Sequence, residues 1–140
     1  MDLQKAVLDS LYLFNQSPDH RIYTLVEFNH YCIFPLLHQK AQLFYDGTKP
    51  KGFVSWAWLT DEEAHNFLQE RWVPDEEVYQ RPDKITDELQ LWGIEFIAPF
   101  GGTLKVMRGM MEHSQTILGK RVSAHWRRFK QPDVVHKKEF

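Results

Sequence analysis

The segment from residue 41 to residue 59 limits the possible folds more than any other part of the chain. Residues 41–45 and 53–59 are apolar and rich in aromatic side chains, whereas residues 46–52 (DGTKPKG) combine glycine, proline and polar residues. Two such segments around a turn predict a β-hairpin, whose strands pair antiparallel. The sequence therefore predicts a fold that contains an antiparallel sheet.

The segments around this hairpin carry helical and extended patterns in turn. Thr60 and Glu63 have the spacing of a capping box, which predicts that a short helix opens there. Other helices are predicted at residues 3–14, 25–37 (with a possible bend at Pro35) and 103–113, strands at 89–100 and 121–128, and a surface loop at 74–87. A chain of 140 residues has the usual size of one domain. We therefore predict a single domain over residues 1–140, of mixed α/β (α+β) class.

The composition excludes several classes of protein. Cys32 is the one cysteine, so an internal disulfide and a cysteine-rich metal site cannot form. The chain has no run of about eighteen apolar residues, the length that suggests a transmembrane helix, and its start lacks the basic region of a signal peptide. We therefore expect a cytoplasmic protein without a cleaved signal peptide.

Charge is unevenly distributed along the chain. Residues 1–103 hold 8 Lys and Arg against 16 Asp and Glu, whereas residues 104–140 hold 9 against 3. A basic C-terminal third can bind phosphate, nucleic acid or an acidic protein, or it can simply be a solvated face.

His20 is the histidine best placed for chemistry among the seven in the chain. It follows Pro18 in a polar segment between two predicted helices, where a rigid turn could direct it into a cleft, although a surface histidine would fit the same pattern. His30 and His38 are eight residues apart, but no carboxylate or cysteine completes a ligand set around them. We therefore predict no metal site.

Glu95 interrupts a strand of large apolar side chains, WGIEFIAPFGG. In a central strand its carboxylate would be buried and would need a histidine or arginine partner, whereas in an edge strand it would face water. Strand alternation places Gly93 and Ile97 on the face of Glu95 and Trp92 on the other face. Gly101, Gly102 and Thr103 then lead into a helix, where free backbone N–H groups could bind an anion or form a tight turn.

Four motifs resemble one enzyme family in their order along the chain. They are SPDHR, the hairpin strand FVSWAWLT, WGIEFIAPFGG, and the helix with KVMRGM. The chain is similar to the RTX toxin-activating lysine acyltransferases. This resemblance implies an acetyltransferase-like (GNAT-like) fold, in which helices flank a central, mostly antiparallel twisted sheet. It also implies transfer of a fatty acyl group from acyl carrier protein to a lysine of a protoxin.

The resemblance assigns His20 as the catalytic histidine, acting as general base, with an acyl-histidine intermediate as a variant. Glu95 stands where the family usually has aspartate, and would orient His20 with a side chain one methylene longer. No permanently bound cofactor is implied, because the acyl-phosphopantetheine of the carrier protein is the donor substrate.

The remaining candidate residues follow from these assignments. Gly101, Gly102 and Thr103 would receive the oxyanion or the phosphopantetheine phosphate. An acyl slot would be lined by aromatic side chains that could equally be core: Trp56, Trp58, Phe96 and Phe100. Acidic carrier protein would dock on basic residues of the C-terminal third: Lys120, Arg121, Arg127, Arg128 and Lys130.

Two other functions fit the sequence. The first is an acyltransferase of the same fold that acts on a small-molecule amine or a nucleic-acid base, with acyl carrier protein or coenzyme A as donor. The second is a non-catalytic module that binds nucleic acid or an acidic partner through RVSAHWRRFK, although the slightly negative net charge and the lack of a known motif disfavour nucleic acid. A homodimer is compatible with either function.

Overall fold

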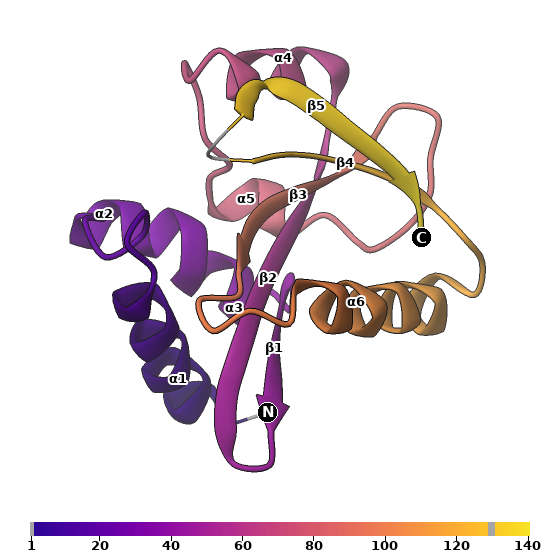
Figure 1. Ribbon diagram of the computed structural model, residues 1–140. Helices are drawn as coiled ribbons and strands as arrows, with labels where there is room; N and C mark the ends of the chain where they lie inside the picture. Colours follow the sequence, from indigo (N-terminus) through magenta and orange to yellow (C-terminus); the bar gives the residue numbers. More distant parts are fainter. Residues whose placement is uncertain (1, 129–130) are drawn as a thin grey trace.

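The computed structural model describes residues 2–128 and 131–140, with the backbone alone at residues 128 and 131–133. The elements of this part of the chain follow one another from α1 to β5 (Figure 1). They are α1 (Leu3–Gln16), α2 (Leu25–Phe28), a π-helical turn (Asn29–Ile33), α3 (Phe34–Leu37), β1 (Ala41–Asp46), β2 (Lys49–Leu59), α4 (Asp61–Leu68), α5 (Glu76–Tyr79), β3 (Gln90–Ile97), α6 (Thr103–Leu118), β4 (Ser123–Arg128) and β5 (Gln131–Glu139).

The strands form a sheet in the order β1-β2-β3-β4-β5 within the described residues. All neighbouring pairs are antiparallel except β3 and β4, which are parallel because α6 crosses between them. The predicted hairpin is confirmed, with a tighter turn than expected: Asp46 pairs with Lys49, and Gly47 has a φ of 62°. The mixed α/β class and the mostly antiparallel sheet are confirmed.

Helices cover both faces of this sheet (Figure 1). On one face, α1 and α3 pack on β2 and β3 through residues such as Phe14 and Phe53. Towards the other end of the same face, α4 and α5 pack through Phe67 and Tyr79. On the opposite face, α6 covers the sheet with Val106 and other buried side chains.

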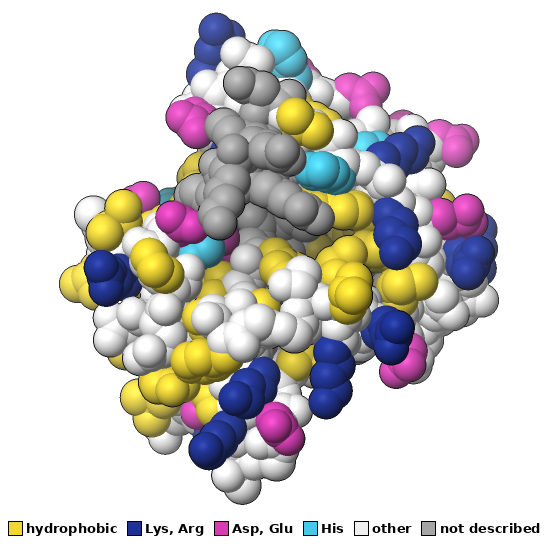
Figure 2. All heavy atoms as spheres, viewed as in Figure 1, with side chains coloured by type: hydrophobic (Ala, Val, Ile, Leu, Met, Phe, Trp, Pro, Cys, Tyr) yellow, Lys and Arg dark blue, Asp and Glu magenta, His cyan; other side chains and the backbone are white. Residues whose placement is uncertain are grey.

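Part of the apolar surface of α1 and α2 remains exposed. Figure 2 shows hydrophobic side chains gathered over these two helices. The exposed side chains there include Leu8, Leu11, Ile22, Leu25 and Val26. Such a concentration of exposed apolar groups typically marks a binding surface.

Three predicted segments differ from the structure. The helix expected at residues 25–37 is divided by the π-helical turn, and Pro35 is the second residue of α3, directly after that turn. The loop expected at residues 74–87 contains α5, whose first turn is capped by Asp75 through a 3.1 Å bond from the Val78 N–H. The strand β5 was not predicted, because its sequence QPDVVHKKE is mostly polar.

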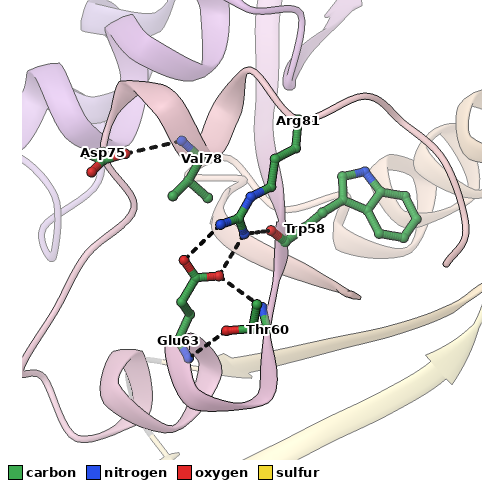
Figure 3. Close-up of polar contacts among 6 residues, drawn as sticks. All are labelled: Trp58, Thr60, Glu63, Asp75, Val78 and Arg81. Atoms are coloured by element: carbon green, nitrogen blue, oxygen red, sulfur yellow. Dashed lines mark hydrogen bonds and ion pairs between the residues drawn. The ribbon is translucent and has the colours of Figure 1, made fainter. Parts of the chain in front are cut away.

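The loop after α5 is fixed to the end of β2 by Arg81 (Figure 3). Its guanidinium donates to both carboxylate oxygens of Glu63, at 2.6 and 2.9 Å, and to the Trp58 carbonyl at 2.7 Å. Glu63 also completes the predicted capping box with Thr60, which is confirmed. One carboxylate therefore caps α4 and holds the loop.

Candidate active site

A β-bulge in β3 sets the direction of Glu95. Ser55 of β2 pairs with Glu95 and the next residue, Trp56, pairs with Gly93, so Ile94 is an extra residue on β3. Simple alternation predicted that Gly93 shares the face of Glu95 and that Trp92 lies on the opposite face, and both predictions were wrong. The inserted residue instead turns the carboxylate towards α1, on the face where Trp92 also packs.

The connection between α1 and α2 is a compact turn that directs polar side chains inwards. The N–H groups of His20 and Arg21 donate to the Ser17 carbonyl at 3.1 and 3.0 Å, and the Tyr23 N–H donates to the His20 carbonyl at 3.1 Å. Thr24 then caps α2 in a capping box. This hydrogen bonding places Ser17, His20 and Tyr23 over Glu95.

Four side chains form a buried hydrogen-bonded cluster. His20 Nε2 lies 2.8 Å from Glu95 Oε2, and His20 Nδ1 lies 2.6 Å from Ser17 Oγ. The Tyr23 hydroxyl donates to Glu95 Oε1 at 2.5 Å. His20 and Glu95 are each only 5% exposed, so the solvated edge-strand alternative for Glu95 was wrong and its predicted pairing with a histidine is confirmed.

The hydrogen bonds determine which nitrogen of His20 is basic. An ionised carboxylate only accepts hydrogen bonds, so Glu95 requires a proton on Nε2. In the neutral ring with that tautomer, Nδ1 carries the lone pair and accepts a hydrogen bond from the Ser17 hydroxyl. Burial, together with the charge of Glu95, raises the pKa of Tyr23 well above its usual value, so its phenol keeps donating to Glu95.

The cluster forms part of the wall of a cleft between α1 and α2. The cleft has a volume of about 520 Å³, within the size range of small-molecule sites. Phe14 closes its base, with its ring edge-on to those of His20 and Tyr23 at 5.7 and 6.0 Å. The described lining residues are mainly apolar: Leu8, Leu11, Tyr12, Phe14, Asn15, His20, Arg21, Tyr23, Thr24, Leu25 and Phe28.

Comparison with protein families matched residues 2–137 to the RTX toxin acyltransferase family, which is nearly the whole chain. The chain belongs to this family. The resemblance carried by the four motifs is thus confirmed, and the protein is an acyltransferase and not a non-catalytic binding module. Comparison with curated proteins gave no match.

The aromatic residues expected in an acyl slot occupy different places in this acyltransferase. Trp56, Trp58 and Phe96 pack on the α6 face of the sheet, and the two indole N–H groups donate to Asp83 at 3.0 and 2.8 Å. The structure therefore separates them from His20, which lies on the other face. Phe100 alone approaches the cleft, with its ring 6.0 Å from that of Tyr12.

The residues expected to bind an anion lie directly after Phe100. Gly101 and Gly102 have φ values of 85° and 75°, which glycine adopts without strain. Gly102 is the N-cap of α6 and provides no side chain to cap it, and Thr103 begins the helix. Both glycines and Thr103 are exposed.

The predicted docking residues divide into three groups. Lys120 and Arg121 are exposed after α6. Arg127 packs on α4 instead, with its guanidinium 4.8 Å from the centre of the Phe67 ring and a 3.2 Å bond to the Leu68 carbonyl. The side chain of Arg128 and all of Lys130 lie outside the described residues.

The other histidines singled out in the sequence have separate partners. His30 Nδ1 lies 3.1 Å from the Pro74 carbonyl, and His38 Nε2 lies 3.0 Å from Glu76. Within residues 2–128 and 131–140, no three His, Cys, Asp or Glu side chains gather around a possible metal position. No helix in the same ranges is both long and apolar enough to cross a bilayer.

Ser17 and Tyr23 were missed by the sequence analysis. Each is three residues from His20, so one compact turn can bring all three side chains together. Pro18, which fixes the backbone between Ser17 and His20, was the available signal. For Tyr23 the sequence offers no comparable sign, because its role depends on the position of Glu95 in the sheet.

Proposed function

We propose that this acyltransferase moves a fatty acyl group from acyl carrier protein to a lysine side-chain amine of an RTX-type protoxin. His20 acts as general base and Glu95 positions it. The observation that supports this proposal is the buried Ser17–His20–Glu95–Tyr23 cluster in the wall of an apolar cleft. A base held beside an apolar binding site is what transfer of a fatty acyl group requires.

The reaction needs a deprotonated amine and a stabilised leaving thiol. The lysine nitrogen attacks the thioester carbonyl, a C–N bond forms, and the C–S bond to phosphopantetheine breaks. The amine proton passes to His20 Nδ1, either through the Ser17 hydroxyl or after that hydroxyl turns aside, and the imidazolium returns the proton to the departing sulfur. Glu95, 2.8 Å from Nε2, stabilises the imidazolium while the proton is held.

A covalent route through Ser17 is the second candidate. The 2.6 Å contact between Ser17 Oγ and His20 Nδ1 has the geometry of a nucleophile and its base. In that route the thioester acylates Ser17 before the lysine attacks the resulting ester. Mass spectrometry of the enzyme, incubated with acyl carrier protein donor and no acceptor, separates the routes, because the covalent one adds one acyl mass per chain.

Further residues complete the proposed site. Backbone N–H groups of Gly102 and Thr103 bind the phosphopantetheine phosphate or the oxyanion, since the first turn of α6 has no side-chain cap. The Gly101 N–H already donates to the Ala98 carbonyl at 3.2 Å, so Gly101 contributes by shaping the turn. Lys120 and Arg121 attract the acidic carrier protein, and this attraction weakens with salt. Turnover that does not fall between low and high ionic strength would argue against the docking role.

The decisive experiment compares His20→Ala with His65→Ala. His65 is an exposed histidine of α4 and serves as the matched control. Acylation of a protoxin lysine is followed by mass spectrometry with acyl carrier protein or coenzyme A donors. We expect His20→Ala to lose roughly 10²- to 10⁴-fold in rate, with an unchanged circular dichroism spectrum, and His65→Ala to match the wild type. Full activity of His20→Ala would overturn the proposal, and acylation of small amines alone would favour a different acceptor.

A further inference from the structure

Three tyrosines from different elements lie near the Glu95 carboxylate. Tyr23 belongs to the turn before α2, Tyr31 to the π-helical turn and Tyr79 to α5; burial, and after it the negative charge of Glu95, raises the pKa of each phenol. The Tyr23 hydroxyl donates to Glu95 Oε1 at 2.5 Å, whereas in the part of the chain that the structure describes the other two hydroxyls make no bond to this carboxylate. Of the three, Tyr23 is therefore the one that can control where the carboxylate points.

A glutamate needs more than one contact to be held at a fixed angle, because its last torsion is broad and roughly two-fold. The Glu95 N–H donates to Ser55 Oγ at 3.2 Å, which fixes the strand but not the carboxylate. Tyr23 binds Oε1 and thereby leaves Oε2 for His20 Nε2, which lies 2.8 Å away. With a partner on each oxygen, the plane of the carboxylate is fixed against the imidazole.

Tyr23 is itself held by its backbone and by its ring. Its N–H donates to the His20 carbonyl at 3.1 Å. Its ring packs edge-on against Phe14, with the ring centres 6.0 Å apart, and lies 5.2 Å from the ring of Tyr31 on another side. The hydroxyl is therefore a donor in a fixed position, as a group that orients a functional side chain must be.

We infer that Tyr23 is a positioning residue for acyl transfer, which turns the Glu95 carboxylate towards His20 and takes up part of its charge. The inference rests on the proposed function, in which Tyr23 has no task of its own. A hydrogen bond donated to a carboxylate lowers the affinity of that carboxylate for a proton. Because Glu95 and His20 titrate as a coupled pair, loss of the Tyr23 hydroxyl makes the pair take up a proton at a higher pH.

The other ionisable groups around the pair keep their charge near neutral pH. Burial raises the pKa of the Tyr31 phenol and of the Cys32 thiol to about 12, and it raises that of Tyr79 well above its usual value. The charged side chains around the turn and these tyrosines are carboxylates and guanidinium groups, which do not titrate near pH 7. They are Asp19 and Arg21 of the turn, Glu27 of α2, Glu70 after α4 and Arg127 of β4. A change in the pH dependence of Tyr23 variants can thus be attributed to the pair.

The test replaces Tyr23 by phenylalanine, which keeps the ring in the wall of the cleft and removes only the hydroxyl. We expect kcat of Tyr23→Phe to fall roughly tenfold, with the KM values of donor and acceptor unchanged. The acidic limb of its pH–rate profile should move up by roughly one pH unit, the tenfold change in proton affinity that one lost hydrogen bond to a charged group produces. Tyr31→Phe is the matched control, because it removes a neighbouring hydroxyl and leaves the bond at Oε1 in place.

An acidic limb of Tyr23→Phe that coincides with that of Tyr31→Phe would overturn the inference, and a lower urea midpoint with an unmoved limb would show a structural role alone. Replacement of Tyr23 by 3-fluorotyrosine, a stronger donor of nearly the same size, gives a second variant that should move the limb to lower pH; an unmoved limb there also counts against the inference.

A titration of the His20 ring followed by ¹⁵N NMR gives a readout that does not depend on turnover. An upward shift of its midpoint in Tyr23→Phe, but not in Tyr31→Phe, supports the inference even if the wild-type enzyme transfers no acyl group, which would refute the proposed function alone. Acyl transfer by the wild type without such a shift in Tyr23→Phe would refute the inference and leave the proposed function in place.

Discussion

Replacing Glu95 by glutamine tests the central electrostatic step, because the amide has nearly the shape of the carboxylate and no charge. Glu95 accepts from His20 Nε2 at 2.8 Å and from the Tyr23 hydroxyl at 2.5 Å. An amide offers one accepting oxygen and one donating nitrogen, so one of these partners must change. If the NH₂ group faces His20, the ring proton moves to Nδ1, and the nitrogen beside Ser17 is no longer a base.

The expected magnitudes separate catalysis from stability. Two hydrogen bonds to a charged group, each worth about 1.5–3 kcal/mol, become neutral bonds worth about 0.5–1.5 kcal/mol. The cost of burying the carboxylate disappears at the same time. We therefore expect Glu95→Gln to lose at most about 2 kcal/mol of stability, against about 5–15 kcal/mol for a typical domain. The acyl-transfer rate should fall by roughly 10²- to 10⁴-fold, the usual contribution of acid–base catalysis.

Single-turnover acylation and urea unfolding measure the two effects on the same protein. Glu62→Gln, at an exposed position in α4, is the matched control. Glu95→Asp keeps the charge but shortens the reach, so its rate should lie between those of wild type and Glu95→Gln. A Glu95→Gln enzyme within threefold of the wild-type rate would refute the positioning role. If Glu95→Gln fails to fold whereas Glu95→Asp folds and keeps the wild-type rate, the charge of residue 95 matters for stability alone.

Three further predictions concern the rest of the molecule. A Cβ at Gly109 would lie 2.9 Å from Phe44 Cδ1. Gly109→Ala should therefore lower the free energy of unfolding, measured in urea, by about 1 kcal/mol, because overpacking outweighs the higher helix propensity of alanine. Adding Phe44→Leu to Gly109→Ala should restore stability. Burial raises the pKa of the Cys32 thiol to about 12, so it should stay unreactive towards a disulfide reagent at pH 8 until urea unfolds the chain. Arg81→Lys cannot hold both oxygens of Glu63 and should lower the urea midpoint by the equivalent of about 1–2 kcal/mol.

The predictable parts of this protein were those with a local cause. The hairpin followed from turn residues between apolar segments, and the start of α4 followed from the spacing of Thr60 and Glu63. For the long-range pair of His20 and Glu95, the local signal was that a carboxylate in an apolar strand requires a histidine or arginine partner, and the family resemblance identified that partner as His20. The sequence supplied a buried acid and a histidine on a rigid turn, and the structure joins them at 2.8 Å.

The unpredictable parts depend on pairing between distant segments. Nothing in QLWGIEFI indicates that Ile94 is extra, since the bulge appears only against the register of β2. The same dependence hid the role of Trp56 and Trp58, whose polar atoms are satisfied by Asp83 of a loop 25 or more residues away. A tryptophan-rich strand predicts burial, but its face is decided by register.

The turn between α1 and α2 links the cleft to the base. It supplies Ser17, His20 and Tyr23 to the polar cluster, and His20, Arg21 and Tyr23 also line the cleft. A ligand that fills the cleft must therefore exclude water from the same side chains that hold the proton. With less water, the attraction between the His20 imidazolium and Glu95 strengthens. If the donor occupies this cleft, donors that fill it should consequently raise kcat as well as lower KM, whereas a cleft that only anchors the donor would change KM alone.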